Sequence, residues 1–169
     1  VVDLFCGAGG SSEGFVRAGF KVLAAVDLEK TAVKTYRLNH PGVAEDRVIC
    51  GDIRELPKGT LARLAGRKLD VLLGSPPCQG FSTAGFRSKK TRTGYRVEDD
   101  ERNHLWEWMV AAALELKPKL VLMENVPGMQ SARKEEMSFL EAVALRLQEG
   151  GYRTEVWQLN AAAFGVPQE

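Results

Sequence analysis

A cysteine that follows two prolines, Cys78 in the segment Pro76-Pro77-Cys78-Gln79, is the best candidate for nucleophilic chemistry in this sequence. The prolines restrict the backbone that leads to the thiol, and the mostly apolar residues 69–73 predict a strand that ends just before it. A thiolate held at a rigid strand end can attack an electrophilic carbon. Because most cysteines are buried structural residues, that alternative stays open at this point.

A carboxyl group, that of Glu124, follows a second apolar run at residues 120–123. If both runs are strands of one parallel sheet, their carboxyl ends lie at the same edge, and we expect Glu124 close to Cys78. Taken alone, Glu124 could instead be a helix-capping acid. The two residues together predict a site at the strand ends.

Three glycines, Gly7, Gly9 and Gly10, follow the mostly apolar residues 1–5 and predict a turn between a strand and a helix. Glycines let a ligand approach the backbone, and the amide groups at the start of the helix attract a negatively charged group. A dinucleotide-binding turn would carry a third glycine at the position of Ser12. The serine disfavours a nicotinamide-dependent oxidoreductase.

Two aspartates follow the next predicted strands. Asp27 is placed to accept hydrogen bonds from ribose hydroxyls, and Asp52 could accept one from an adenine amino group. Each also has a structural alternative, since Asp27 could cap the helix that begins near Lys30 and Asp52 could shape a turn after Gly51. Together with the glycine turn they favour a nucleoside-bearing ligand, and S-adenosylmethionine fits.

These residues need a parallel sheet to bring them together, and the hydrophobic pattern predicts one. Strand-like runs at residues 1–5, 21–26, 47–50, 69–73, 120–123 and 152–158 alternate with helix-like segments. Helices are predicted after Gly10, with Ser11 or Ser12 as N-cap, and at residues 30–38, 61–65, 104–116 and 135–148. This alternation is typical of an α/β fold with helices on both faces of the sheet.

Length and composition agree with one globular domain of 169 residues, of which 44% are hydrophobic. Nothing in the sequence predicts a membrane span or a signal peptide, so a cytoplasmic protein is expected. The formal net charge of +1 does not by itself indicate a nucleic-acid partner. One stretch nevertheless gathers basic residues that could meet phosphates or serve only solubility: Arg87, Lys89, Lys90, Arg92, Arg96 and Arg102.

The other cysteines and the histidines suggest no chemistry. Cys6 and Cys50 lack any CxxC spacing, so they are expected to be free, buried structural thiols. His40 and His104 lack the spacing of metal ligands and are expected at the surface or in loops. No metal site is predicted.

Three segments resemble the ordered motifs of the cytosine carbon-5 DNA methyltransferases: Asp3-Leu4-Phe5-Cys6-Gly7-Ala8-Gly9-Gly10, Pro76-Pro77-Cys78-Gln79 and Glu124-Asn125-Val126. Residues 160–168 are similar to the segment that leads into the family's arginine-bearing strand. The resemblance extends from Val1 to Gln168. It implies a Rossmann-like, S-adenosylmethionine-dependent methyltransferase sheet, with residues 1–169 forming the catalytic domain.

The resemblance also implies the roles of the catalytic residues. Cys78 would attack carbon-6 of a cytosine flipped out of duplex DNA, which makes carbon-5 nucleophilic toward the donor methyl group. Glu124 would bind ring nitrogen 3 and the exocyclic amine, with Asn125 holding its geometry and Pro77 beside the nucleophile. Residues 80–102 match the loop that closes over the base.

By the same comparison, a set of residues matches positions that contact the cofactor: Phe5, Gly7, Gly9, Gly10, Asp27, Leu28, Asp52, Ile53, Pro77 and Leu105. Leu28 departs from the family, which often has a tryptophan there to stack on adenine. An aliphatic side chain can still cover the ring.

Family members continue beyond a segment like Pro167-Gln168 into a strand with arginines and a target-recognition domain. The fragment is therefore expected to lack an interior strand, and the missing part, in the same or a second chain, is an expected partner. The recognised DNA sequence is not readable here. A restriction-modification enzyme is expected, and a solitary or regulatory enzyme stays open as an alternative. The expected location is the cytoplasm of a bacterium or archaeon, or the nucleus if the source is eukaryotic.

Two rival functions remain beside duplex DNA methylation. The same chemistry could act on transfer RNA, although the sequence lacks the Cys-Phe-Thr signature of that branch. The chain could also be a catalytically silent DNA-binding fragment. DNA methylation is preferred.

Overall fold

The computed structural model describes residues 1–66, 68–77, 104–127, 133–134 and 137–167. Cys78, residues 80–102 with their basic cluster, and Gln168 lie outside the described residues. Among the helices of the described part, none has both the length and the apolar character needed to cross a membrane.

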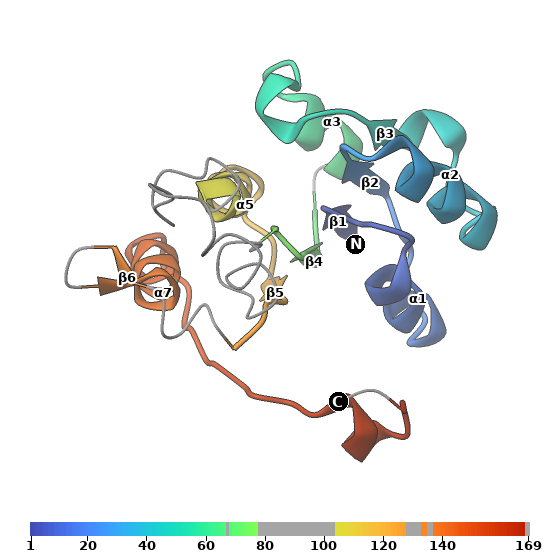
Figure 1. Cartoon of the computed structure of the whole chain (residues 1–169). Coiled ribbons are helices and arrows are strands. Elements are labelled where there is room, and N and C mark those ends of the chain that lie inside the picture. The colour runs from blue at the N-terminus through green and yellow to red at the C-terminus, as the bar shows by residue number, and fades with distance from the viewer. Residues whose placement is uncertain (67, 78–103, 128–132, 135–136, 168–169) are drawn as a thin grey trace, which may run out of the picture.

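Five parallel strands form the central sheet (Figure 1), in the spatial order β3-β2-β1-β4-β5. Their bounds are β1 Val2–Leu4, β2 Ala24–Asp27, β3 Val48–Cys50, β4 Val71–Gly74 and β5 Leu120–Met123. The predicted parallel α/β sheet is thus confirmed. Because the order of the strands reverses between β1 and β4, ligands are expected at the carboxyl ends of these central strands.

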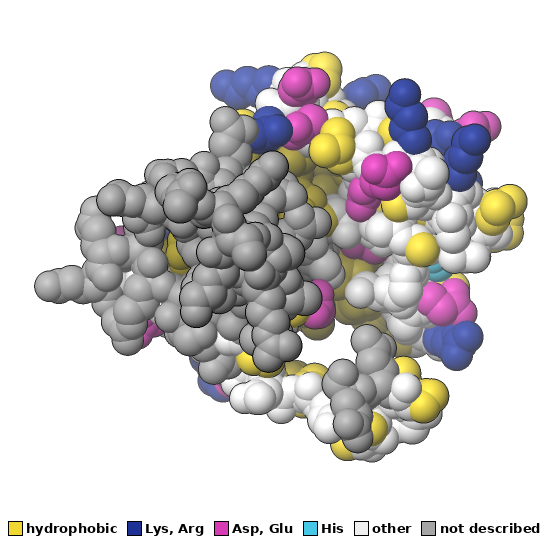
Figure 2. All heavy atoms as spheres, in the orientation of Figure 1, with side chains coloured by type: hydrophobic (Ala, Val, Ile, Leu, Met, Phe, Trp, Pro, Cys, Tyr) yellow, Lys and Arg dark blue, Asp and Glu magenta, His cyan; other side chains and the backbone are white. Residues whose placement is uncertain are grey.

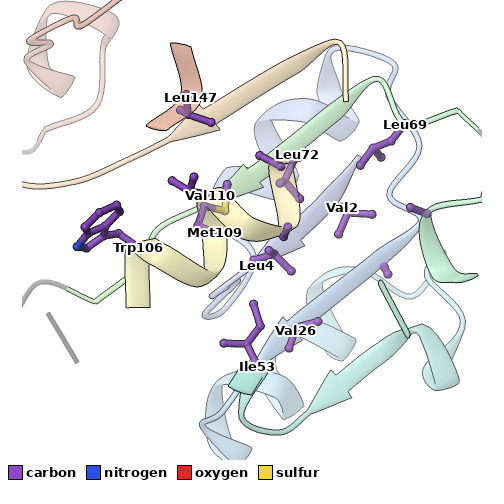
Figure 3. Close-up of a cluster of buried hydrophobic side chains, with 14 of the residues drawn as sticks. Val2, Leu4, Val26, Ile53, Leu69, Leu72, Trp106, Met109, Val110 and Leu147 are labelled. Carbon is purple, nitrogen blue, oxygen red and sulfur yellow. The ribbon is translucent and has the colours of Figure 1, made fainter. Parts of the chain in front are cut away.

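Helices cover both faces of this sheet. The helices α3 (Thr60–Ala65), α5 (Leu105–Leu116) and α7 (Phe139–Glu149) pack on one face and α1 (Gly10–Arg17) and α2 (Lys30–Asn39) on the other. Figure 3 shows the first layer, in which Val2, Leu4 and Leu72 of the sheet meet Met109 and Val110 of α5. The strand residues alternate between faces, so Val1, Val71 and Leu73 meet Phe15 of α1 on the opposite side.

The strand β5 is covered on one side only by the described residues. Val121 and Met123 pack against the main core, whereas Leu120 and Leu122 are 50% and 39% exposed. These two leucines point toward the face on which α1 and α2 lie, since alternate residues of a strand point to opposite faces. An uncovered apolar strand of this kind is available for packing by another segment.

Two predicted helix starts are wrong. The helix α1 has Gly9 as its N-cap and no side-chain cap, because Ser12 is buried and bonds elsewhere. The helix predicted from residue 135 begins at Phe139, where Ser138 and Glu141 form a reciprocal capping box. A short hairpin of β6 (Arg133–Lys134) and β7 (Met137–Ser138) precedes it.

The strand predicted at residues 152–158 is also wrong. This segment makes no ladder with any described strand, and in Figure 1 it runs away from the sheet toward the C-terminus. Val156 and Trp157 are exposed along it, and so is Leu159 directly after it. Alternating apolar residues favour a strand, but a strand forms only where a neighbour can accept and donate its hydrogen bonds.

Three short 3₁₀ helices complete the described part: Glu45–Arg47, Ile53–Glu55 and Ala161–Phe164.

Candidate active site at the carboxyl edge of the sheet

The turn after β1 is tightly bent. Phe5, Gly7 and Gly9 all have positive φ, of 58°, 52° and 92°. A left-handed conformation is rare for a bulky residue such as Phe5, and such conformations gather at functional sites. Among the hydrogen bonds that hold this backbone are those from the Cys6 amide to the Val26 carbonyl (3.1 Å) and from the Gly9 amide to the Cys6 carbonyl (2.9 Å).

The three glycines of the turn have different surroundings. A Cβ built on Gly7 or Gly10 would meet no atom within 4 Å, so their backbone borders open space. The first amide groups of α1, beginning at Gly10, have no partner inside the helix. Gly7 and Gly10 are therefore the glycines beside which a ligand has room. A Cβ on Gly9 would collide with His40.

Asp27, at the end of β2, supports the same turn. One carboxylate oxygen accepts a hydrogen bond from the Gly7 amide (2.8 Å) and the other accepts from the Glu29 amide (2.8 Å). The alternative that Asp27 caps α2 is wrong, because the N-cap is Glu29, whose side chain accepts from the Thr31 amide. A carboxylate has about four acceptor sites, so Asp27 retains capacity for ribose hydroxyls.

Asp52 has the structural role that the sequence left open. It is the N-cap of the 3₁₀ helix Ile53–Glu55, accepting from the Arg54 amide (2.9 Å) and pairing with the Arg54 guanidinium (2.7 Å). The hydrogen bonds from the Arg54 side chain hold the pKa of Asp52 below its ordinary value. Contact with an adenine stays a prediction.

The apolar residues matched to the cofactor differ in exposure. Ile53 is buried in the main core, and Phe5 and Leu105 are half-buried and pack against it. Leu28, directly after β2, is 66% exposed. Of these four side chains, Leu28 therefore has the largest free surface for a flat ring.

The ends of β4 and β5 lie side by side, as predicted. Gly74 is in register with Met123, and the Glu124 amide donates to the Gly74 carbonyl (3.0 Å). The Asn125 side chain donates from Nδ2 to the Pro76 carbonyl (3.1 Å) and accepts from the Val126 amide (2.9 Å). Asn125 thus fastens the segment that leads to Cys78.

Glu124 is exposed at this edge and Pro77 is half-buried. Because Glu124 is exposed, its carboxyl group is accessible to a ligand. The position of the Cys78 thiol itself lies outside the described residues.

The two described cysteines differ from each other. Cys6 is a buried free thiol, as predicted, and burial raises its pKa far above the ordinary value, an effect to which the charges of Asp3 and Asp27 add. A thiol of this kind is unreactive. The prediction that Cys50 is buried is wrong, because it ends β3 at the edge of the sheet and is exposed.

Sequence reasoning missed a buried polar group beneath the glycine turn. His40, expected at the surface, is only 5% exposed, and its Nε2 bonds the Gly9 carbonyl (3.0 Å). Ser12 donates to the carboxylate of Asp3 (2.6 Å) and shares a hydrogen bond with the Tyr36 hydroxyl (2.8 Å). The sequence did contain one signal for this burial: Tyr36 and His40 are four residues apart, a spacing that places both rings on the same face of a helix. His104 is half-buried and pairs with Glu107.

Burial changes the acidity of Asp3. The side chain is 2% exposed, and desolvation raises the pKa of its carboxyl group to about 7. The hydrogen bond from Ser12 opposes this rise, and the nearby charge of Asp27 adds to it. Near neutral pH the carboxyl group therefore exists in both protonation states.

Comparison with known proteins identifies relatives along the whole chain. Residues 1–169 match the family described as C-5 cytosine-specific DNA methylase. The type II methyltransferase M.XorII of Xanthomonas oryzae pv. oryzae is 39% identical over 173 residues, which cover 99% of this chain and 38% of the relative. M1.HphI of Haemophilus parahaemolyticus is 40% identical over 170 residues, covering 99% of this chain and 42% of the relative. The chain thus spans about two fifths of the length of these relatives.

Comparison with solved structures finds the same fold in other proteins. A protein encoded within an E. coli prophage and ascribed to the DNA modification methyltransferases superposes with a TM-score of 0.65 at 29% identity, covering 88% of this chain and 37% of the other. A DNMT2 variant of Spodoptera frugiperda superposes with a TM-score of 0.61 at 24% identity, over 88% of this chain and 40% of the other, and supports the fold alone. The chain belongs to the C-5 cytosine-specific DNA methylase family.

Proposed function

We propose that this chain is the catalytic, S-adenosylmethionine-binding part of an enzyme that methylates carbon-5 of cytosine in duplex DNA. The observation that carries the proposal is the 3.1 Å hydrogen bond from Asn125 to the Pro76 carbonyl. It joins the segment that leads to Cys78 with the segment that bears Glu124, in a chain matched along its whole length by the family. This hydrogen bond supports the proposal that Cys78 acts as nucleophile and Glu124 as acid at one edge of the sheet.

The residues around the glycine turn fit S-adenosylmethionine. Open space beside Gly7 and Gly10 suits the methionine part, whose carboxylate is attracted by the first amides of α1. Asp27 has acceptor capacity left for the ribose hydroxyls, and the exposed Leu28 can cover the adenine. When bound, the cofactor supplies an electrophilic methyl group on a sulfonium.

The protein's part of the reaction then follows from the chemistry of cytosine. The Cys78 thiolate forms a bond to carbon-6, and the electron pair of the 5,6 double bond becomes available at carbon-5 for the methyl group. Glu124 stabilises the charge that develops on the ring by bonding nitrogen 3 and the amine. Loss of the carbon-5 proton to a base restores the double bond and expels the thiolate.

This attack requires a base outside the helix, so we propose that the enzyme flips its target cytosine. The basic residues between Arg87 and Arg102 would contact the phosphates around it. Neutralising Arg87, Lys89 and Lys90 should then weaken DNA binding and flatten its dependence on salt. An unchanged salt slope would remove this segment from the DNA interface.

The partner that we propose for this chain is the C-terminal part by which its relatives are longer. Surface for it is provided by the exposed Leu120 and Leu122 of β5 and by residues 152–158, which form no ladder with a described strand. Together the two parts make what we call the assembled enzyme. Because the named relatives come from bacteria and are type II methyltransferases, we propose a bacterial restriction-modification setting in the cytoplasm.

Mechanism-based trapping tests this function. A target with 5-fluorocytosine cannot lose a proton from carbon-5, so the assembled enzyme with S-adenosylmethionine should stay covalently attached to the DNA in denaturing gels. Cys78→Ala should abolish trapping, whereas the matched change of an exposed thiol, Cys50→Ala, should not. Trapping by Cys78→Ala would refute the assignment of the nucleophile.

Two further measurements separate the rival functions. Transfer RNA offered in place of DNA should not be methylated, and efficient methylation of RNA alone would reassign the substrate. Glu124→Gln should slow trapping while leaving the affinity for S-adenosylmethionine unchanged, because its proposed work lies in the adduct. Trapping by Glu124→Gln at the wild-type rate would refute the proposed catalytic role of Glu124.

A further inference from the structure

The C-terminal turn of α2 holds the backbone of the glycine turn. The Asn39 side chain donates from Nδ2 to the Ala8 carbonyl (2.8 Å), and His40 bonds the next carbonyl, that of Gly9, through Nε2 (3.0 Å). A carbonyl oxygen only accepts, so Nε2 is the donor in this hydrogen bond. Two consecutive carbonyls of the turn are therefore fixed from the same helix end.

The same helix also holds the first turn of α1. The Tyr36 hydroxyl lies 2.8 Å from the Ser12 hydroxyl, which donates in turn to Asp3 of the central strand. The rings of Tyr36 and His40 are in contact, with centroids 4.5 Å apart and planes tilted by 42°. Tyr36, His40 and Ser12 are all nine-tenths buried or more, so the group is built into the fold.

Gly9 is the point at which this group meets the turn. A Cβ on Gly9 would lie 2.2 Å from His40 Nε2 and 2.9 Å from a ring carbon of Tyr36. The space that a side chain would fill is occupied by the two rings, whereas the Cβ positions of Gly7 and Gly10 are open. Gly9 therefore serves the contact with α2, and Gly7 and Gly10 leave open space beside the backbone of the turn.

We propose that Tyr36, Asn39 and His40 are positioning residues that keep the turn of Gly7 to Gly10 in its cofactor-binding conformation. The inference rests on the proposed use of S-adenosylmethionine by this chain. Without these side chains, the turn would occupy the binding conformation for only part of the time. The apparent dissociation constant rises by the inverse of that fraction, so a turn correctly formed in a tenth of the molecules binds about tenfold more weakly.

Binding of S-adenosylhomocysteine to the assembled enzyme, measured by calorimetry, tests the proposal. His40→Ala should weaken binding roughly tenfold, and His40→Gln, which restores an amide donor toward Gly9, should recover most of the affinity. Asn39→Ala changes an exposed residue and should weaken binding roughly threefold in a protein that folds normally. In turnover assays the KM for S-adenosylmethionine should rise while kcat is kept.

The controls distinguish positioning from general stability. Ser138→Ala removes the capping box of α7, away from the turn, and should lower stability while leaving the affinity for S-adenosylhomocysteine unchanged. If the wild-type enzyme bound no S-adenosylhomocysteine, the proposed function would fail. If it bound, and both His40→Ala and Asn39→Ala bound equally well, the function would stand and the positioning role would be refuted.

Discussion

Replacing Asp3 by asparagine should change how the stability of the chain depends on pH. Asp3 lies buried on the central strand β1 and accepts a hydrogen bond from the Ser12 hydroxyl of α1, which in turn contacts Tyr36; the charge of Asp27 on β2 also acts on it. In the folded chain the carboxyl group of Asp3 keeps its proton up to about pH 7, whereas in the unfolded chain the same group loses its proton near pH 3.8. Between these values the folded state binds more protons, so the free energy of unfolding falls as pH rises.

The size of the effect follows from the two pKa values. A tenfold change in proton affinity corresponds to about 1.4 kcal/mol, so a rise from 3.8 to about 7 makes the wild type about 4 kcal/mol less stable at pH 8 than in acid, through this group alone. Asp3→Asn removes the titration but keeps an acceptor for Ser12. The difference in unfolding free energy, variant minus wild type, should therefore increase by about 4 kcal/mol from pH 4 to pH 8.

Urea denaturation of both proteins at several pH values, followed by circular dichroism, measures this difference. The exposed Asp70 provides a control of opposite sign, because its hydrogen bond with Lys119 lowers its pKa. For Asp70→Asn, the unfolding free energy of the variant minus that of the wild type should decrease as pH rises through the acid range. This decrease should be far smaller than the increase expected for Asp3→Asn, because Asp70 is exposed. A difference between Asp3→Asn and wild type that stayed constant from pH 4 to pH 8 would refute the raised pKa of Asp3.

Other substitutions test separate parts of the structure. Gly9→Ala should destabilise the chain, because φ is +92° at Gly9 and the added methyl group would collide with His40. Gly14→Ala, in open space on α1, should instead stabilise the chain by about 0.5–1 kcal/mol. The urea midpoints of the two variants test both predictions. Ser138→Ala should cost about 1 kcal/mol by loss of the capping box, measured in the same way; an unchanged midpoint would deny the cap any contribution. Leu28→Trp should tighten S-adenosylhomocysteine binding in calorimetry, since an indole at this 66% exposed position can stack on adenine; weaker binding would place the adenine elsewhere.

The sheet could be predicted from the sequence because its inner strands are buried on both faces. Such strands are continuous apolar runs, as in Val71–Gly74, and the alternation with helices then implies parallel pairing. Neighbouring strand ends could be predicted with it, which is why the ends of β4 and β5, which lead to Cys78 and Glu124, were expected side by side. Local pattern and topology are sufficient for these features.

The remaining features depend on contacts between distant residues. Ser12 was a reasonable N-cap by type, but its hydroxyl is used by Asp3, nine residues away on β1. His40 is buried because it meets Gly9, 31 residues earlier. Residues 152–158 have the composition of a strand, yet whether they form one is decided by a neighbour that no local pattern describes. Tertiary packing overrides the local preference in each case.

The strand order also affects how the chain can fold during synthesis. The pairings of β1 with β2 and of β2 with β3 involve residues 2–50 only, so the half of the sheet that bears the glycine turn, Asp27 and Asp52 can assemble first. The other edge of β1 stays unpaired until β4, residues 71–74, has left the ribosome. In that interval the backbone of β1 is an open sheet edge beside apolar Val2 and Leu4, a site at which incorrect strand pairing can occur.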